Sequence, residues 1–396
     1  MKAYVLHDIG DIRYGEVKDP VLKPDEVLIE VKAVGICGSD IPRIFENGTY
    51  SFPLIPGHEF SGRIVETGAE ADPDWLGKRA GVFPLLPCRN CAPCGQRHYE
   101  MCRNYSYFGS RTDGAFAQYV AVPVWNLVEL PDEVSYEAAA MLEPMAVAAH
   151  AMRSMGFGEN VDLSDAGERI GCEEKSIRAE EEESHAAKGM KAEEEAGRAA
   201  KSIGQNRKET VAVCGLGTIG LLLTMFLKEA GIEDLLVIGN KEFQKKNILD
   251  LGIPENRYLD SRDGDVVHRI LDRTGGLGVD VFFECVGKNE TVSEGLLATA
   301  PGGRIQLVGN PASDMNFDKN TYWKILRNQL TVRGNWNSTF LHSAGDDWHY
   351  VLDLLQKGKI HPEHYITQRF RLDELEKGLH IMKDKTEEYV KVMITL

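Results

Sequence analysis

The apolar positions of this chain follow one period in its first third and a different one in its second half. Residues 1–8 and 27–34 alternate apolar with polar side chains, and glycine and proline interrupt the pattern at short intervals. Alternation of this kind predicts short strands. We therefore expect a β-rich domain at the start of the chain.

A helical pattern begins near Ser135 and runs to Pro144, where the proline ends or redirects it. Glu143 falls at this point. A carboxylate at a helix end can face a cleft, although from its local sequence alone Glu143 reads as a solvated acid.

The second half contains an apolar strand, residues 209–214, that leads into the glycine pattern G-x-G-x-x-G and an apolar helix from residue 221. Further apolar strands at 235–238, 279–286, 303–308 and 330–332 alternate with helical segments, which predicts a doubly wound parallel sheet. In this context the glycines indicate dinucleotide binding rather than an ordinary βα turn. The predicted cofactor-binding residues of the turn are Gly215, Leu216, Gly217, Thr218, Ile219 and Gly220.

The second strand of this predicted sheet ends in Gly239, Asn240 and Lys241, where an NAD-binding domain usually carries an acid for the ribose hydroxyls. A glycine there leaves room for a 2′-phosphate, and Lys241 can supply its counter-charge. We therefore favour NADP over NAD or expect use of both. In the alternative, Asn240 binds the ribose and NAD is used.

Composition narrows the classes of function. A chain of 396 residues with 43% apolar content can form two domains, and its formal charge of −16 disfavours nucleic acid as a partner. No apolar run approaches the ~20 residues that cross a bilayer. The start, MKAYVLHDIG, has no basic segment followed by an apolar core, so we expect a cytoplasmic protein with reduced thiols.

Four cysteines lie close together with the spacing C-x2-C-x2-C-x7-C. They are Cys88, Cys91, Cys94 and Cys102. Disulfide pairing is the alternative, but four thiolates on a compact loop complete a tetrahedral zinc shell, so a structural zinc is predicted. The acidic balance argues against a zinc module that binds DNA. Cys172, Cys214 and Cys285 are scattered and are expected to be reduced core residues.

A second set of possible metal ligands is drawn from distant stretches: Cys37, His58 with Glu59, and Glu143. Mixed thiol, imidazole and carboxylate ligands suit a catalytic ion that keeps a position for substrate. Taken singly, His58 reads as a core histidine. Its setting between Gly57 and Gly62, where the backbone can turn tightly, favours a ligand.

The order of these motifs resembles the zinc-dependent medium-chain alcohol and polyol dehydrogenases. The resemblance rests on Gly35-Ile-Cys-Gly-Ser-Asp40, Gly57-His-Glu59, the four cysteines, Glu143-Pro144 and the glycine turn. Within the family, residues 37–48, 84–88 and 108–114 are most similar to the galactitol-1-phosphate 5-dehydrogenases.

This resemblance implies a GroES-like catalytic domain over residues 1–146, with a structural zinc lobe at about 84–104, and a Rossmann cofactor domain over 147–336. Residues 337–396 would return to the catalytic domain. It also implies two zinc ions per chain, the catalytic one held by Cys37, His58 and Glu143, with Glu59 as a fourth or exchanging ligand. The same ligand types also bind Co²⁺ or Fe²⁺.

The resemblance further implies hydride transfer between a secondary hydroxyl of a polyol, free or phosphorylated, and NAD(P), in a homodimer or homotetramer. Ser39 is a candidate for proton transfer, and equally a turn residue. Arg43, Arg111 and Lys324 are candidate ligands for a substrate phosphate, and each can instead be a solvated surface charge. The alternatives are a threonine-type or simple secondary-alcohol dehydrogenase, or a cofactor-binding protein without catalysis.

The chain departs from the family in an insertion at about 156–208 that is rich in Glu, Ala and Lys. Such a composition favours a solvated helical excursion. The alternative is an arm that docks on a neighbouring subunit through Ile170, Ile177, Met190 and Ile203.

Overall fold

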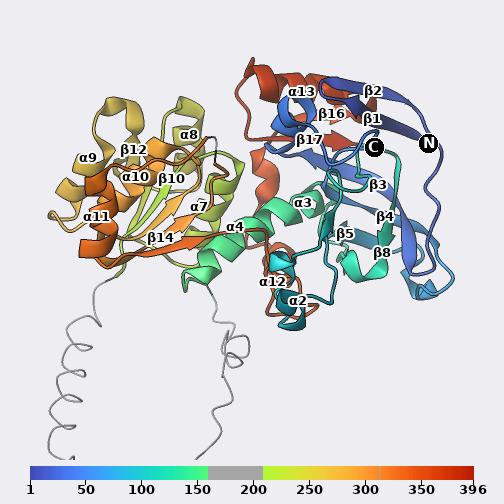
Figure 1. Ribbon diagram of the computed structural model, residues 1–396, viewed down its shortest axis with the longest axis horizontal. Helices are drawn as coiled ribbons and strands as arrows, with labels where there is room; N and C mark the ends of the chain where they lie inside the picture. Colours follow the sequence, from blue (N-terminus) through green and yellow to red (C-terminus); the bar gives the residue numbers. More distant parts are fainter. Residues whose placement is uncertain (159–207, 312) are drawn as a thin grey trace, which may run out of the picture.

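A computed structural model describes residues 1–158, 208–311 and 313–396. Apart from its two ends, the predicted insertion, with its candidate arm residues and Cys172, lies outside these ranges. The described residues form two sheet-based halves that lie side by side (Figure 1).

The half on the left of Figure 1 contains a six-stranded sheet in which every pair of neighbours is parallel. Its order is β12 (Tyr258–Asp260), β11 (Leu235–Gly239), β10 (Val211–Cys214), β13 (Val279–Glu284), β14 (Thr299–Leu307) and β15 (Thr331–Gly334). This confirms the predicted doubly wound sheet and adds β12, whose three residues are too few to show a period. The order reverses beside β10, where ligands bind in such sheets.

Side chains of the central strands alternate between the two faces of this sheet. Ala212 and Cys214 pack with α9 (Val266–Arg273), α10 (Asn289–Ala298) and α11 (Lys319–Arg327). Val211 and Val213 pack on the other side with α7 (Thr218–Glu229) and α8 (Glu242–Asp250). Burial on both faces explains why the strands are continuous apolar runs.

The other half is built on a seven-stranded sheet to which distant segments contribute. Its path is β16 (Ile366–Arg371), β17 (Lys391–Thr395), β3 (Glu26–Ile36), β4 (Glu59–Thr67), β5 (Arg79–Val82) and β9 (Leu127–Glu129), and β8 (Tyr119–Pro123) also pairs with β3. The last strand of the chain therefore lies beside β3, with Met393 opposite Gly35. Around this sheet lie β1 (Lys2–Asp8), β2 (Asp11–Glu16), α1 (Asp40–Pro42), the π-helical turn η1 (Arg43–Asn47) and α13 (Leu375–Asp384).

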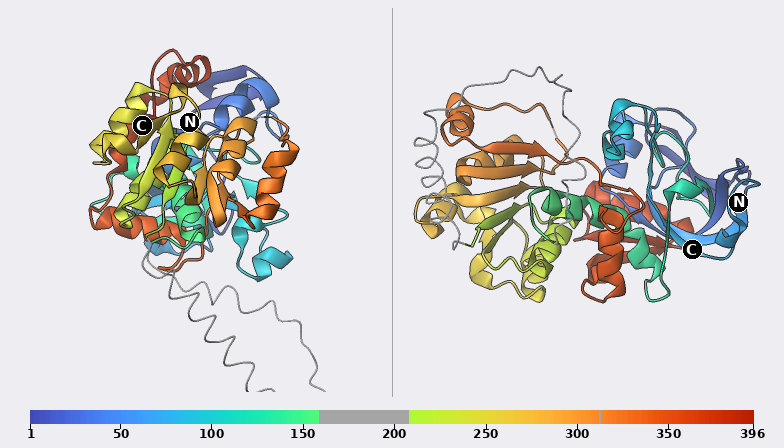
Figure 2. Two further views of the ribbon diagram at one scale, coloured as in Figure 1. Left: turned by 90° about the vertical axis from the view of Figure 1, so that its left-hand side faces the viewer. Right: turned by 90° about the horizontal axis from the view of Figure 1, so that it is seen from below.

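Three helices lie where the two halves meet (Figure 2). They are α3 (Tyr136–Ala140), α4 (Leu142–Ser154) and α12 (Asp347–Gln356). The helix α3 begins after Ser135, as the sequence predicts, and the Ser135 hydroxyl caps it by accepting a bond from Ala138 N. It ends at Ala140, however, and a new helix begins before Pro144. Glu143 thus sits in the first turn of α4.

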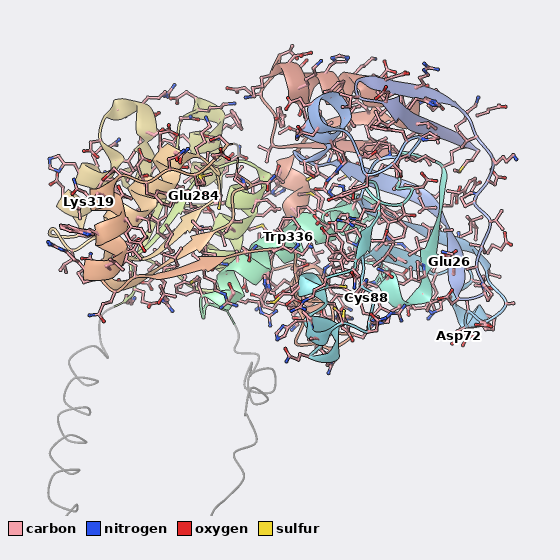
Figure 3. All side chains as sticks on the ribbon, viewed as in Figure 1. Glu26, Asp72, Cys88, Glu284, Lys319 and Trp336 are labelled. Atoms are coloured by element: carbon pink, nitrogen blue, oxygen red, sulfur yellow. The ribbon has the colours of Figure 1, made fainter. Side chains whose placement is uncertain are left out.

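The four-cysteine segment forms a small lobe that contains α2 (Ala92–Gly95) and is followed by the strand β7 (Ser106–Tyr107), which pairs with β6 (Leu85–Leu86). Figure 3 labels Cys88 on this lobe, in the lower middle of the view, and Lys319 at the far left in the other half. None of the described helices is long and apolar enough to cross a bilayer.

Candidate functional site

Cys37, His58 and Glu59 come together where β3 ends and β4 begins. One ligand atom from each lies within 4.8 Å of the others, and His58 and Glu59 are buried. Ligands of a tetrahedral zinc ion are about 3.3–3.8 Å apart. The structure therefore brings three of the four predicted ligands into a set that a small adjustment would close on one ion.

Asp40 lies behind His58 and was not among the residues predicted from sequence. Its buried Oδ1 atom is 3.3 Å from His58 Nδ1 and 3.0 Å from Arg43 Nη1. Burial alone would raise the pKa of Asp40, but attraction to His58 and Arg43 outweighs burial and lowers it. A carboxylate behind a ligating histidine orients the ring, and Arg43 balances the charge of Asp40.

Within the described structure His58 Nδ1 is one of four buried side-chain atoms without a regular hydrogen bond. Its nearest polar partner is Asp40 Oδ1 at 3.3 Å, so Nε2 is the ring nitrogen left for a metal ion. A thiol, an imidazole and a carboxylate form a donor set that fits zinc.

Ser39 is directed at the metal set, but its hydroxyl is already engaged. Ser39 Oγ donates to Cys37 Sγ over 3.2 Å, and Ser39 N approaches the same sulfur at 3.5 Å. Both contacts fix the position of the Cys37 sulfur within the metal set.

Glu143, predicted as a ligand together with Cys37 and His58, is buried near this set but is not part of it. Its Oε1 atom accepts a hydrogen bond from the Tyr107 hydroxyl at 3.0 Å, and the Tyr107 ring packs edge-on against the His58 ring. Burial raises the pKa of Glu143, and repulsion from Glu59 adds to this effect. Tyr107 thus holds this carboxylate to one side.

A second unpredicted residue, Lys391, reaches the set from β17. Its ammonium forms an ion pair with Glu59, and both side chains are only 2% exposed. Burial would lower the pKa of Lys391, but the charges of Glu59 and Cys37 raise it. The one local signal for this role is a lysine within the apolar run of β17.

The four cysteines of the lobe form a second, closed set. The sulfur pairs Cys91–Cys94 and Cys88–Cys102 are 3.5 and 3.4 Å apart, and Cys88–Cys94 and Cys91–Cys102 are each 4.0 Å apart. Sulfurs around a tetrahedral zinc ion are separated by about 3.8 Å, whereas bonded sulfurs are about 2.05 Å apart. The arrangement fits a structural zinc and excludes the disulfide alternative in this structure.

Backbone hydrogen bonds prepare the lobe for metal. Those from Arg103 and Cys94 lower the pKa of Cys91 to about 6, whereas burial raises the pKa of Cys94 to about 12. Among the remaining cysteines, Cys214 is buried and Cys285 partly buried, and both are free thiols, as predicted.

The glycine turn joins β10 to α7. Gly215 has φ +93°, and a Cβ at Gly220 would overlap the carbonyl oxygen of Gly215, so both positions require glycine. A Cβ at Gly217 would meet no described atom within 4 Å. Because Gly217 is the N-cap and has no side chain, first-turn N–H groups of α7 are available to a phosphate. The turn therefore fits a dinucleotide.

Gly239 does not open a space for a 2′-phosphate, so that part of the sequence argument is wrong. A Cβ there would lie 2.8 Å from Gln244 Oε1 and 2.9 Å from the Tyr258 hydroxyl. Gln244 in turn accepts a bond from Asn240 N at 3.0 Å and donates to Leu216 O at 3.1 Å. Glycine is needed because protein side chains fill this volume. Asn240 and Lys241 are exposed beside it.

The three candidate phosphate ligands have different surroundings. Arg43 is engaged by Asp40. Arg111 is exposed, and its guanidinium lies between the rings of Tyr50 at 3.9 Å and Tyr105 at 4.5 Å. Its backbone N–H bonds Tyr107 O at 2.9 Å, so it sits on the turn that also carries the tyrosine beside His58.

Lys324 lies on α11, at the outer end of the cofactor half and far from β3 and β4 (Figure 1). The predicted approach of Lys324 to the substrate is therefore not seen within one chain. The reason is that α11 packs on the outer strands of the parallel sheet.

The chain joins a dinucleotide-type sheet to a β domain that has two metal sets, one open and one closed. This combination defines a nicotinamide-dependent, metal-dependent dehydrogenase. Residues 23–132 match the alcohol dehydrogenase GroES-like domain, and residues 218–357 match the zinc-binding dehydrogenase family. The chain belongs to the zinc-dependent medium-chain alcohol and polyol dehydrogenases.

Two curated relatives illustrate the range of this family. Galactitol 1-phosphate 5-dehydrogenase from Escherichia coli is 28% identical over 370 residues, which is 93% of this chain and 92% of that protein. L-threonine 3-dehydrogenase from Pyrococcus furiosus is 29% identical over 374 residues, 93% of this chain and 91% of that one.

Two solved structures are similar over the whole of this chain. Galactitol-1-phosphate dehydrogenase from Escherichia coli is 27% identical with a TM-score of 0.80, covering 100% of both chains. A zinc-binding dehydrogenase from Sinorhizobium meliloti, bound to NADP, is 25% identical with a TM-score of 0.79 and covers 100% of this chain and 99% of that one.

Proposed function

We propose that this enzyme transfers a hydride between a secondary hydroxyl of a polyol phosphate and NADP, giving a ketose phosphate. The observation that carries the proposal is the metal set of Cys37, His58 and Glu59. Tyr107 lies beside His58, and the turn that carries Tyr107 also presents Arg111. A zinc ion held there would act as a Lewis acid and lower the pKa of a substrate hydroxyl.

The chain's own residues have distinct tasks in this proposal. Cys37 and His58 would hold the ion, Ser39 donates to the Cys37 sulfur, and Asp40 orients His58. Glu143, which accepts a hydrogen bond from Tyr107, would be a further ligand. The role of Ser39 as a proton carrier stays a prediction, because its hydroxyl donates to sulfur here.

Arg111 is the phosphate ligand that we favour. Two tyrosine rings hold its guanidinium in place while leaving it exposed, so little side-chain entropy is lost when an anion binds. A planar guanidinium also matches two phosphate oxygens at once. We leave Lys324 out of the proposed site because of its distance, and Arg43 because Asp40 engages it.

The preference for NADP rests on Asn240 and Lys241, which follow β11 without an acid to repel a 2′-phosphate. Lys241 is exposed at the N-terminus of α8 and is not held in any ion pair described here. The NADP-bound relative supports this choice. The competing proposal is that Asn240 binds the ribose of NAD.

An amino-alcohol substrate is the second candidate, because the threonine dehydrogenase is as similar to this chain as the galactitol-phosphate enzyme. The two candidates differ in charge, since a threonine-like substrate needs an acid for its ammonium and a polyol phosphate needs a cation. Arg111, on the turn that carries Tyr107, favours the phosphate. We further propose a cytoplasmic homodimer or homotetramer, to be checked by light scattering.

The test is initial-rate absorbance of reduced nicotinamide with polyols, their phosphates and threonine, each with NAD and with NADP. We expect the highest kcat/KM for a polyol phosphate with NADP, and loss of turnover after a chelator removes metal. Turnover on threonine but not on polyol phosphates would contradict the proposed substrate. Turnover that survives complete metal removal would contradict the mechanism.

Arg111→Leu separates the phosphate role from general damage. We expect kcat/KM for a polyol phosphate to fall at least tenfold, because a hydrogen bond to a charged group contributes about 1.5–3 kcal/mol. The kcat/KM for the free polyol should stay unchanged. Arg327→Leu is the matched control, because Arg327 also stacks on an aromatic ring, Trp323 at 4.6 Å, but on α11. Equal losses on both substrates would remove Arg111 from the site.

A further inference from the structure

The buried ion pair between Lys391 and Glu59 joins the end of the chain to the metal set. Lys391 lies in β17, and its ammonium also donates to the carbonyl of Ile36 over 3.1 Å. A buried charge is stable only with close partners, so this lysine has a single available position. Lys391 thus contacts one residue of the set, Glu59, and the backbone directly before another, Cys37.

The surrounding backbone is shaped for this pair. Met393 is opposite Gly35 in the β17–β3 register, and a Cβ at Gly35 would overlap both the Glu59 carboxylate and the Lys391 side chain. Glycine at this position therefore leaves the space in which the ammonium meets the carboxylate.

Charge explains what the pair does. The ammonium of Lys391 contacts the Glu59 carboxylate directly, so the two groups together are neutral. Neutral clusters are favoured in a buried site. The two carboxylates also have separate holders, Lys391 for Glu59 and Tyr107 for Glu143.

We propose that Lys391 is a positioning residue that restrains the Glu59 carboxylate, so that Glu59 does not close the coordination position needed by the substrate. This inference rests on the proposed function, in which a metal bound by Cys37 and His58 needs an open position. Without the lysine, Glu59 is a free buried anion next to a cation and becomes a permanent ligand.

A hydrogen bond links this restraint to the cofactor site. The Thr218 hydroxyl, in the first residue of α7 after the glycine turn, donates to the carbonyl of Val390 over 2.5 Å. Val390 precedes Lys391 directly. Cofactor bound at the glycine turn would act on Lys391 through this bond.

The test measures metal release rather than turnover alone. Zinc transfer to a coloured chelator is followed for the native enzyme and for Lys391→Met. Cys37→Ser should retain zinc only in the four-cysteine lobe, so its release curve identifies the part of the signal that comes from the lobe. We expect Lys391→Met to release the other zinc about tenfold more slowly, since changes behind metal ligands alter affinity by ~10–100-fold. Its kcat should fall, while Lys391→Arg, which keeps the charge, stays close to the native enzyme.

The Glu59→Gln background decides whether Lys391 acts through Glu59. In that background, adding Lys391→Met should change the rate of metal release less than twofold. With Co²⁺ bound, Lys391→Met should alter the absorption spectrum when Glu59 is present and leave it unchanged in the Glu59→Gln background. An unchanged release rate, or an equal change in both backgrounds, overturns the inference.

Two further outcomes are distinguishable. If Lys391→Met does not fold, the double variant Lys391→Met with Glu59→Gln is used, because it leaves no unpaired charge. Its rate of zinc release is compared with that of Glu59→Gln alone, and a difference above twofold overturns the inference. If native protein holds only the lobe zinc, the proposed function itself fails. Finally, cofactor should change zinc release in the native enzyme but not in Thr218→Val, and an equal response in both removes the link through Val390.

Discussion

Asp347 is a buried charge that fastens α12 to the helix carrying Glu143, and replacing it tests how the two halves are held together. Its Oδ2 atom accepts bonds from His150 Nδ1 at 2.8 Å and from the backbone and hydroxyl of Thr339 at 2.8 and 2.7 Å. Its Oδ1 atom accepts from Arg153 at 2.5 Å, and its side chain is 2% exposed. His150 and Arg153 belong to α4.

Asp347→Asn keeps the shape but leaves the Arg153 charge without its buried partner. Breaking a buried pair in this way destabilises a protein by about 3–5 kcal/mol. The asparagine side chain can still form some of the hydrogen bonds of Asp347, so we expect a loss near the lower end, about 3 kcal/mol. Urea unfolding followed by circular dichroism measures it. A loss of this size is a large part of the stability of a typical domain.

The chain provides a matched control. His380 and Asp384 form the same type of pair at 3.0 Å on the surface of α13, with both side chains about half exposed. Asp384→Asn should cost less than about 0.5 kcal/mol, since exposed pairs contribute little. If the two variants differ by less than 1 kcal/mol, the argument from burial is refuted.

The pH dependence gives a second check of the same pair. Burial raises the pKa of Asp347, but pairing with His150 and Arg153 lowers it by more. The contribution of Asp347 to stability is therefore complete above its unfolded pKa of about 3.9 and is lost on acidification below it. Burial lowers and Asp347 more strongly raises the pKa of His150, so that contribution is complete below about pH 6.5 and is lost as pH rises through the higher folded value. The difference between native and Asp347→Asn should therefore be largest at about pH 4–6.5. A difference that grows above pH 8 would contradict this.

Two further predictions concern the lobe and the cofactor turn. Cys94→Ser should lower the zinc content from two to one per chain and loosen the lobe, measured by metal analysis and by hydrogen exchange of residues 88–102; retention of both ions would contradict the closed set. Gly239→Ala should destabilise the protein by about 1–3 kcal/mol, because Gln244 and Tyr258 must move. It should weaken NAD and NADP alike in fluorescence titrations, whereas selective loss of NADP would restore the sequence-based explanation of Gly239.

Sequence alone identified features whose parts are close together along the chain. The four cysteines lie within one short segment, and the glycine turn is specified by a strand, three glycines and a helix in succession. Local spacing fixes such sites because few residues separate their groups, so little depends on the rest of the fold. The same holds for the parallel sheet, whose buried strands are visible as apolar runs.

Only the tertiary structure decided which distant groups meet. Lys391 reaches Glu59, and Asp347 reaches His150, through strand and helix packing that no local period encodes. It also placed Glu143 on Tyr107, and showed that Gly239 is packed rather than open. These facts depend on side chains that approach from separate elements, and their energies come from burial of charge, which a linear pattern does not record. The sequence thus determined the class of chemistry, and the packing determined how its charges are held.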